Sequence, residues 1–187
     1  WLMTRRFSIR SLAGTARTLV AVGTDSEASM LVTTRAAGPR RTTGAIGSAA
    51  GAAGAEAAGA GVAAGVGCSF AVAADLAIAR ESASFMLAFT RIGLMPDGGA
   101  SLLVTAAVGR ARAARMALLA EKVGARTAAE WGLIAEAVPD DDFESYVDRL
   151  VDQLAAGPPL AYAATKRVLN AASLSLLEAI LREELDG

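Results

Sequence analysis

A glycine-rich pentapeptide, Ala64-Gly65-Val66-Gly67-Cys68, could stabilise a negatively charged oxygen. We interpret it as a turn that runs into a helix. Glycine allows a ligand to approach the backbone closely, and the first N–H groups of a helix have no intrahelical partners. Such fixed, uncharged donors suit an oxyanion that develops on a carbonyl group. The alternative is a tight strand-to-helix turn with only a structural role, which the glycine spacing alone would favour.

Asp97 is the second candidate, in the sequence Pro96-Asp97-Gly98-Gly99. A single carboxylate can remove a proton from carbon and return it elsewhere. We expect Asp97 to be buried beside Phe89, Leu94 and Met95, where desolvation would raise its pKa as suits a base. Asp is also a favoured residue at the start of a helix, and Ala100-Ser101-Leu102-Leu103 follows at once. Capping and proton transfer both remain open for Asp97, and one does not exclude the other.

Two residue types that often carry catalysis or bind metals are scarce. The chain has no His, and Cys68 is its single cysteine. His-based triads, His metal ligands and intrachain disulfides are therefore excluded, and we predict no metal site. Cys68 has no evident base, which predicts a packed, unreactive thiol. The net charge of -1 gives no reason to expect nucleic acid or a membrane surface as partner.

The elements that would position these residues alternate strands with helices. Val62 to Ala79 is apolar but is broken by glycines and Asp75, so we interpret it as buried core. A short strand is expected over 83–88, and the loop with Asp97 follows. Apolar spacing then predicts successive helices, over 110–121, from Thr127 through Trp131, from Phe143, from Pro158-Pro159, and from Ser173 or Ser175 through Leu185. This order indicates an α/β or α+β domain.

Residues 1–60 differ from the remainder of the chain. Residues 18–22 and 30–34 are interpreted as short strands, but 44–61 is nearly all Gly and Ala, a composition that buries little apolar area. We divide the chain into this atypical segment and a core at 61–187. The segment is predicted to be a disordered leader or linker. A sharper hypothesis is translation from a shifted reading frame, since two Lys against sixteen Arg fits a GC-rich source.

Three segments resemble one protein family. They are GVAAGVGCSFAVAADLAIARESASFMLAFTRIGLMPDGGASLL at 61–103, VGRARAARMALLAEKVGARTAAEWGLIAEAVPDDD at 108–142 and AAGPPLAYAATKRVLNAA at 155–172. Their order and spacing are similar to those of the crotonase (enoyl-CoA hydratase/isomerase) superfamily, with AFTRIGLMPDGG most like its isomerase-type branches. The resemblance covers 61–185 and implies a spiral of ββα turns with a helical C-terminal region. Compared with the family, the chain looks truncated or frameshifted at its start and short at its end.

The resemblance also assigns roles to single residues. The amide of Val66 would form one half of the family's oxyanion hole, and Asp97 would shuttle a proton along the acyl chain. The family's hydratases carry a pair of Glu where this sequence has Ser69 and Phe89, so hydration by two carboxylates is not expected. No segment in residues 1–60 resembles the one that normally supplies the second oxyanion donor. Ala64, Gly65, Gly67, Phe89 and Leu94 are expected to bind the substrate.

The partners implied are those of the family. We expect an acyl-CoA substrate, with coenzyme A arriving as part of it and no other cofactor, and a homotrimer or hexamer in the cytoplasm without nucleic-acid or membrane partners. The expected activity is isomerisation of the acyl-CoA thioester through an oxyanion-stabilised enolate. The alternative from another class is a non-catalytic scaffold of the same fold, or the inactive product of a disrupted gene.

Overall fold

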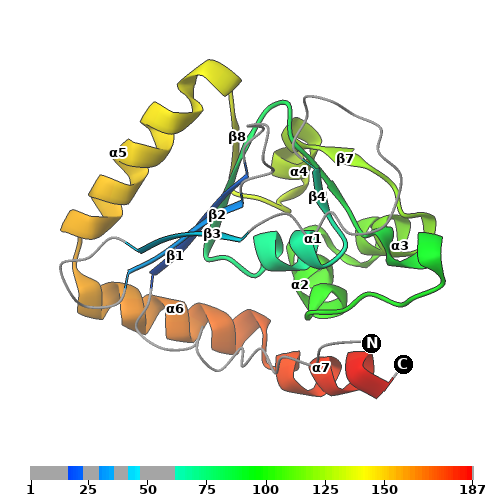
Figure 1. Cartoon of the computed structure of the whole chain (residues 1–187). Coiled ribbons are helices and arrows are strands. Elements are labelled where there is room, and N and C mark those ends of the chain that lie inside the picture. The colour runs from blue at the N-terminus through cyan, green and yellow to red at the C-terminus, as the bar shows by residue number, and fades with distance from the viewer. Residues whose placement is uncertain (1–16, 23–29, 36–41, 47–61, 187) are drawn as a thin grey trace.

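The computed structural model describes residues 17–22, 30–35, 42–46 and 62–186. Two sheets organise this part of the chain (Figure 1). One has five strands in the order β3-β2-β1-β5-β8 and the other has three in the order β4-β6-β7. In the first are β1 (Arg17–Val22), β2 (Met30–Arg35), β3 (Thr42–Ile46), β5 (Leu76–Arg80) and β8 (Glu136–Val138). In the second are β4 (Val62–Ala64), β6 (Ser84–Met86) and β7 (Val123–Gly124).

The chain passes repeatedly from one sheet to the other, with helices between the passages. β4, in the three-stranded sheet, is followed by α1 (Val66–Val72), then by β5 in the five-stranded sheet and by β6 back in the three-stranded one. The 3₁₀ helix η2 (Ala88–Ile92) and helices α2 (Ala100–Val108) and α3 (Arg110–Leu119) precede β7, and α4 (Ala125–Trp131) precedes β8. This alternation is the expected spiral of strand pairs and helices, and the fold is α/β as predicted.

The strands expected near the start of the chain are confirmed as β1 and β2. β1 pairs with β2 antiparallel over six residue pairs and with β5 parallel, from Leu19 opposite Leu76 to Val22 opposite Ala79. The strands β1, β2 and β3 therefore share a sheet with β5 and β8 of the core that we placed at 61–187. The disorder predicted for the segment 1–60 is not tested outside these strands, because its remaining residues lie outside the described ones.

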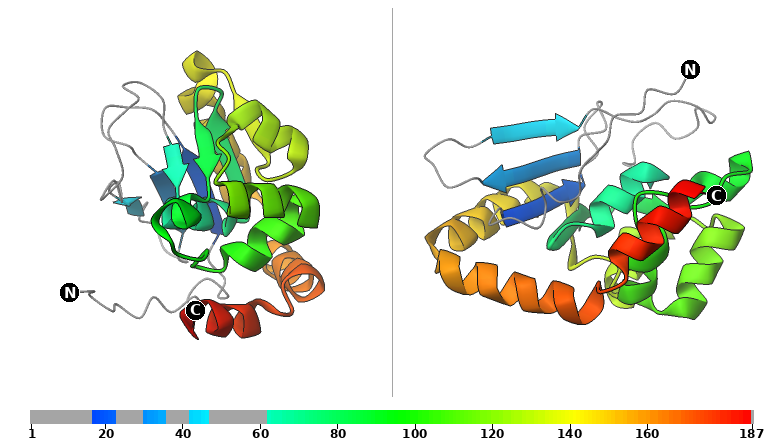
Figure 2. Two further views of the ribbon diagram at one scale, coloured as in Figure 1. Left: turned by 90° about the vertical axis from the view of Figure 1, so that its right-hand side faces the viewer. Right: turned by 90° about the horizontal axis from the view of Figure 1, so that it is seen from below.

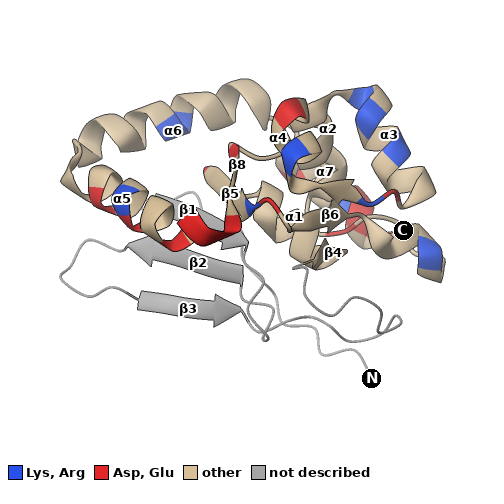
Figure 3. Cartoon of the chain, turned by 90° about the horizontal axis from the view of Figure 1, so that it is seen from above, with Lys and Arg blue, Asp and Glu red and all other residues tan. Residues whose placement is uncertain are grey.

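The main core lies where α1, β6 and α2 to α4 meet. Phe85 and Leu87 are among its largest fully buried side chains, and Cys68, Val104 and Met116 join them. A smaller cluster, formed by Ile78, Val138, Phe143 and Val147, packs α5 (Phe143–Ala156) on β5 and β8. The charged groups gather elsewhere, with acids along η3 (Asp140–Asp142) and α5 and Arg side chains on α3 (Figure 3).

The last two helices form an outer arm. α6 (Pro159–Ser173) and α7 (Leu177–Asp186) follow each other along one side of the molecule (Figure 2). No residue of α6 is buried in the described part of the chain, and the ion pair between Lys166 and Asp75, 2.6 Å, ties it to the turn between α1 and β5. α7 packs against α2, which brings the last described residues next to the loop that carries Asp97. Among the described residues, no helix has the length and hydropathy needed to cross a bilayer.

Candidate active site

The glycine-rich turn connects β4 to α1, as expected. Gly65 has φ 55° and ψ -126°, a conformation that residues with a Cβ rarely adopt. Its N–H donates to the Met86 carbonyl at 2.9 Å. Its carbonyl accepts from the amides of Cys68 and Ser69 at 3.0 and 3.2 Å. Gly65 therefore fixes both the entry into the helix and the attachment of the turn to β6.

The amides of Val66 and Gly67 are the first two of α1. Among the described residues neither has a hydrogen-bond acceptor, as expected for the first turn of a helix. A Cβ on Gly67 would have no non-local atom within 4 Å, so this end of α1 borders open space. Both residues are half-buried, as is Ala64 before them. The geometry leaves two backbone donors ready for an external oxygen.

The loop that carries Asp97 lies against this turn. Ser69, a fully buried residue of α1, donates its hydroxyl to the Asp97 carbonyl at 2.7 Å. A Cβ on Gly98 would lie 3.2 Å from the Cβ of Ser69, so the two backbones approach closely. The structure thus places the backbone of the Asp97 loop against α1, through a contact between residues 28 apart in the sequence.

The expected burial of Asp97 is wrong. Its side chain is exposed, and its Oδ1 accepts from the Gly98 amide at 2.5 Å. Phe89 is buried, but Leu94 and Met95 are 57% and 39% exposed. Gly93 and Gly98 in this irregular segment have φ 74° and 72°, in the left-handed region that favours glycine.

Asp97 is not the cap of a helix either. α2 begins at Ala100, with Gly99 in the capping position and no capping side chain of its own. Its first amides are bound by Glu184 of α7, which accepts from Gly99 at 2.6 Å and from Ser101 at 3.0 Å. We missed Glu184, although Leu177, Leu181 and Glu184 follow the spacing of one helix face. An acid on such an apolar stripe is a usable signal for a buried carboxylate.

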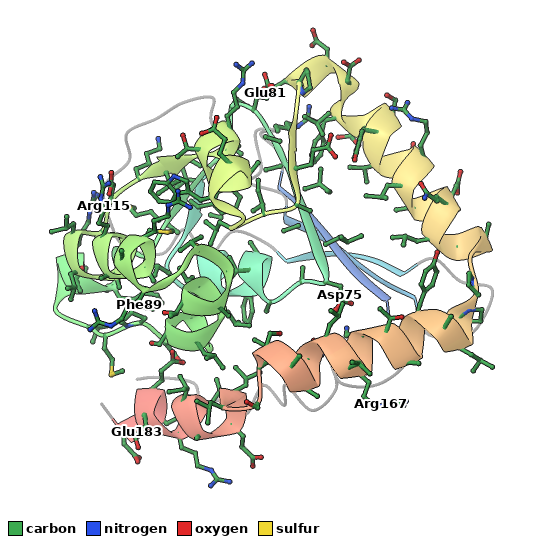
Figure 4. All side chains as sticks on the ribbon, turned by 180° about the vertical axis from the view of Figure 1, so that it is seen from behind. Asp75, Glu81, Phe89, Arg115, Arg167 and Glu183 are labelled. Atoms are coloured by element: carbon green, nitrogen blue, oxygen red, sulfur yellow. The ribbon has the colours of Figure 1, made fainter. Side chains whose placement is uncertain are left out.

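The resemblance places Ser69 and Phe89 where the family's hydratases carry paired Glu, and each of the two contacts the turn or the loop beside it. Besides Asp97, the Ser69 hydroxyl contacts the Gly65 carbonyl at 3.4 Å. The Phe89 ring reaches the space beside Gly65, where a Cβ would be 3.9 Å from it (Figure 4). Phe89 therefore forms an apolar wall beside the turn, and Ser69 donates a hydrogen bond to the backbone of the Asp97 loop.

Cys68 is packed rather than reactive. It is completely buried, and burial raises the pKa of its thiol to about 12, opposed by a hydrogen bond with the Met86 backbone. The neutral thiol therefore persists through the neutral range, and the thiolate is the reactive form. We expect an aromatic disulfide reagent at pH 8 to leave the native protein unmodified and to titrate one thiol after unfolding in guanidinium. Fast labelling of the native chain would contradict this assignment.

The chain is similar in sequence to known proteins over its last two thirds. The sequence profile of the family "Enoyl-CoA hydratase/isomerase" matches residues 56–186. A probable enoyl-CoA hydratase from Rhodobacter capsulatus is 52% identical over 111 residues, which are 59% of this chain and 43% of that protein. A 1,2-epoxyphenylacetyl-CoA isomerase from Escherichia coli is 38% identical over 112 residues, 60% of this chain and 43% of that protein. The chain thus spans less than half the length of these relatives.

Solved structures agree with the sequence comparison. The crystal structure of an enoyl-CoA hydratase from Mycobacterium avium subsp. paratuberculosis matches with a TM-score of 0.67 and 54% identity, over 69% of this chain and 52% of that one. An enoyl-CoA hydratase/isomerase from Pseudoalteromonas atlantica matches with a TM-score of 0.63 and 30% identity, over 67% of this chain and 51% of that one. By its sequence and its fold, the chain belongs to the enoyl-CoA hydratase/isomerase family of the crotonase superfamily.

Proposed function

We propose that the chain isomerises an acyl-CoA thioester through an enolate whose oxygen is bound at the start of α1. The Val66 amide donates to the thioester oxygen, which favours loss of a proton from the neighbouring carbon. Asp97 takes that proton and returns it to another carbon of the acyl chain. Coenzyme A enters only as part of the substrate, and the reaction uses no metal ion.

The hydrogen bond from Ser69 to the Asp97 carbonyl is the observation that carries this proposal. It sets the loop of the candidate base against the helix whose first amides are unpaired. Ser69 and Phe89 provide no carboxylate for the positioning of water, which favours isomerisation over hydration. Among the relatives, the protein from Escherichia coli is named an isomerase and the more similar one from Rhodobacter capsulatus a probable enoyl-CoA hydratase, so this choice rests on the residues of the site.

One specific observation favours the alternative hypothesis, a non-catalytic scaffold. Asp97 is exposed, whereas a base that takes a proton from carbon works best in a water-poor site. In this second candidate function the chain binds acyl-CoA at the same turn and performs no reaction. The two functions share the Val66 donor and differ only in whether Asp97 reaches the substrate.

For the complete protein we carry over from the family resemblance a homotrimer or hexamer in the cytoplasm, without nucleic-acid or membrane partners. The arm offers surface for such an assembly, since Leu160, Val168 and Leu169 of α6 are all more than 60% exposed. Burial of these side chains between protomers would remove apolar area from water. Sedimentation of the purified chain measures the number of protomers.

Turnover and thermal stability together test the two functions. We expect a 3-enoyl-CoA to be converted to the conjugated 2-enoyl-CoA, followed by absorbance. We also expect millimolar enoyl-CoA to raise the Tm by several degrees, because a ligand of the native state stabilises it by RT ln(1 + [L]/Kd). A Tm shift without turnover would support the scaffold. The absence of both turnover and a Tm shift would contradict both functions.

A further inference from the structure

The α7 helix packs directly on the turn that follows Asp97. Gly99 has φ 82°, and a Cβ there would lie 3.1 Å from Leu177 Cδ1 and 3.6 Å from Leu181 Cδ2. The same face of α7 carries Glu184, which is only 6% exposed. The turn 97–99 is therefore covered from the C-terminal side by two leucines and one carboxylate.

Glu184 uses both carboxylate oxygens on this turn. Oε2 accepts from the Gly99 amide at 2.6 Å, and Oε1 accepts from the Ser101 amide at 3.0 Å. A buried carboxylate is tolerated when such donors satisfy it, and the start of α2 offers unpaired amides with a partial positive charge. The contact joins residues 83 and 85 positions apart in the sequence, so it links two elements rather than capping a helix locally.

The other side of Asp97 is held by α1. The Ser69 hydroxyl binds the Asp97 carbonyl at 2.7 Å, and the Cβ position of Gly98 is 3.2 Å from Ser69 Cβ. The Asp97 carboxylate itself has one described hydrogen bond, from the adjacent Gly98 amide. Its direction therefore depends on the backbone of 97–99, which is fixed at its carbonyl by Ser69 and at the Gly99 amide by Glu184.

We propose that Glu184 and Ser69 are positioning residues that hold the Asp97–Gly99 turn from two sides and thereby aim the Asp97 carboxylate. This inference rests on the proposed function, in which Asp97 is the base. Neither residue contacts the reacting atoms in this arrangement. α7 has a defined role in it, since the helix carries one of the two supports of the base.

Neighbouring glutamates on α7 provide a matched comparison. Glu184→Ala removes both acceptors, and Glu184→Gln keeps one acceptor oxygen, whereas Glu183→Ala and Glu183→Gln make the same changes at an exposed residue (Figure 4). We expect Glu184→Ala to speed hydrogen exchange at the Gly99 and Ser101 amides about tenfold or more, because exchange follows local opening. Glu184→Gln should fall between wild type and Glu184→Ala, and both Glu183 variants should match wild type.

Kinetics separate positioning from a merely structural role. Misplacement of a reacting group by about 1 Å can cost about 10²-fold in rate. At a temperature well below each variant's Tm, we expect Glu184→Ala and Ser69→Ala to lower kcat about 10-fold to 100-fold with little change in KM. Unchanged exchange in Glu184→Ala would overturn the contact, and unchanged kcat with faster exchange would overturn the positioning role.

Comparison of Asp97→Asn with Glu184→Ala and Ser69→Ala distinguishes a failure of this inference from a failure of the proposed function. If Asp97→Asn keeps full activity, the proposed function fails, whatever the exchange data show. If that variant is inactive while Glu184→Ala and Ser69→Ala keep full kcat, only the positioning inference fails. If the wild-type preparation shows no turnover, the carbon-13 chemical shift of the Asp97 carboxyl tests the positioning inference instead. We expect the shift to move in both positioning variants and not in Glu183→Ala, and an unmoved shift would overturn the inference.

Discussion

Replacement of Asp97 by Asn should lower the isomerisation rate by about 10²-fold to 10⁴-fold, the usual contribution of a general acid or base. The amide has the shape of the carboxylate but cannot accept a proton from carbon. Its oxygen can still accept the hydrogen bond that Gly98 now donates to Oδ1. The effect should therefore be seen in kcat, measured as conversion of one enoyl-CoA isomer into the other, with little change in KM.

Asp148→Asn is the matched control for this variant. Asp148 is an exposed acid on α5, an element distinct from the turn and the Asp97 loop. Because both aspartates are exposed, we expect the Tm of each variant to remain close to that of the wild type. A normal rate in Asp97→Asn would remove Asp97 from the mechanism and leave acyl-CoA binding as the function of the turn.

Local sequence signals predicted much of the core correctly. Pro158-Pro159 marked the start of α6, which begins at Pro159 with Pro at its first position. Gly132 ends α4 with φ 81°, the left-handed conformation typical of a glycine after a helix. Thr127 was predicted as the N-cap of α4, but Gly124 takes that position without a capping side chain and the helix begins at Ala125. Helix ends without a capping side chain give no such signal.

Long-range contacts were the part that the sequence could not supply. The parallel pairing of β1 with β5 joins segments more than fifty residues apart, and no local propensity specifies it. The start of α2 was also mispredicted, because its amides are bound by a residue distant in the sequence. Asp97 has the sequence context of a cap, but the amides of Gly99 and Ser101 are bound by Glu184 from another helix. A tertiary contact therefore takes the place of the local cap.

The oxyanion role of Val66 can be tested by removing one hydrogen-bond donor without removing the turn. Val66 is the first residue of α1, a position where Pro is well tolerated because its N–H has no helical partner. Gly65 precedes it with φ 55° and ψ -126°, the mirror image of the extended conformation that residues before Pro prefer. Glycine has no Cβ, so it can keep this conformation next to Pro. Val66→Pro should therefore fold.

We expect Val66→Pro to lower kcat by about 10²-fold to 10³-fold, the effect of removing one oxyanion donor. Val66→Ala is its control, since it shortens the side chain and keeps the N–H, and its rate should stay within a few-fold of wild type. Circular dichroism and Tm would establish that both variants retain the fold. Equal losses in the two variants would mean that the Val66 side chain matters and the amide does not. A loss confined to Val66→Pro would assign the effect to the backbone nitrogen of residue 66, because Ala and Pro both lack the branched side chain of Val.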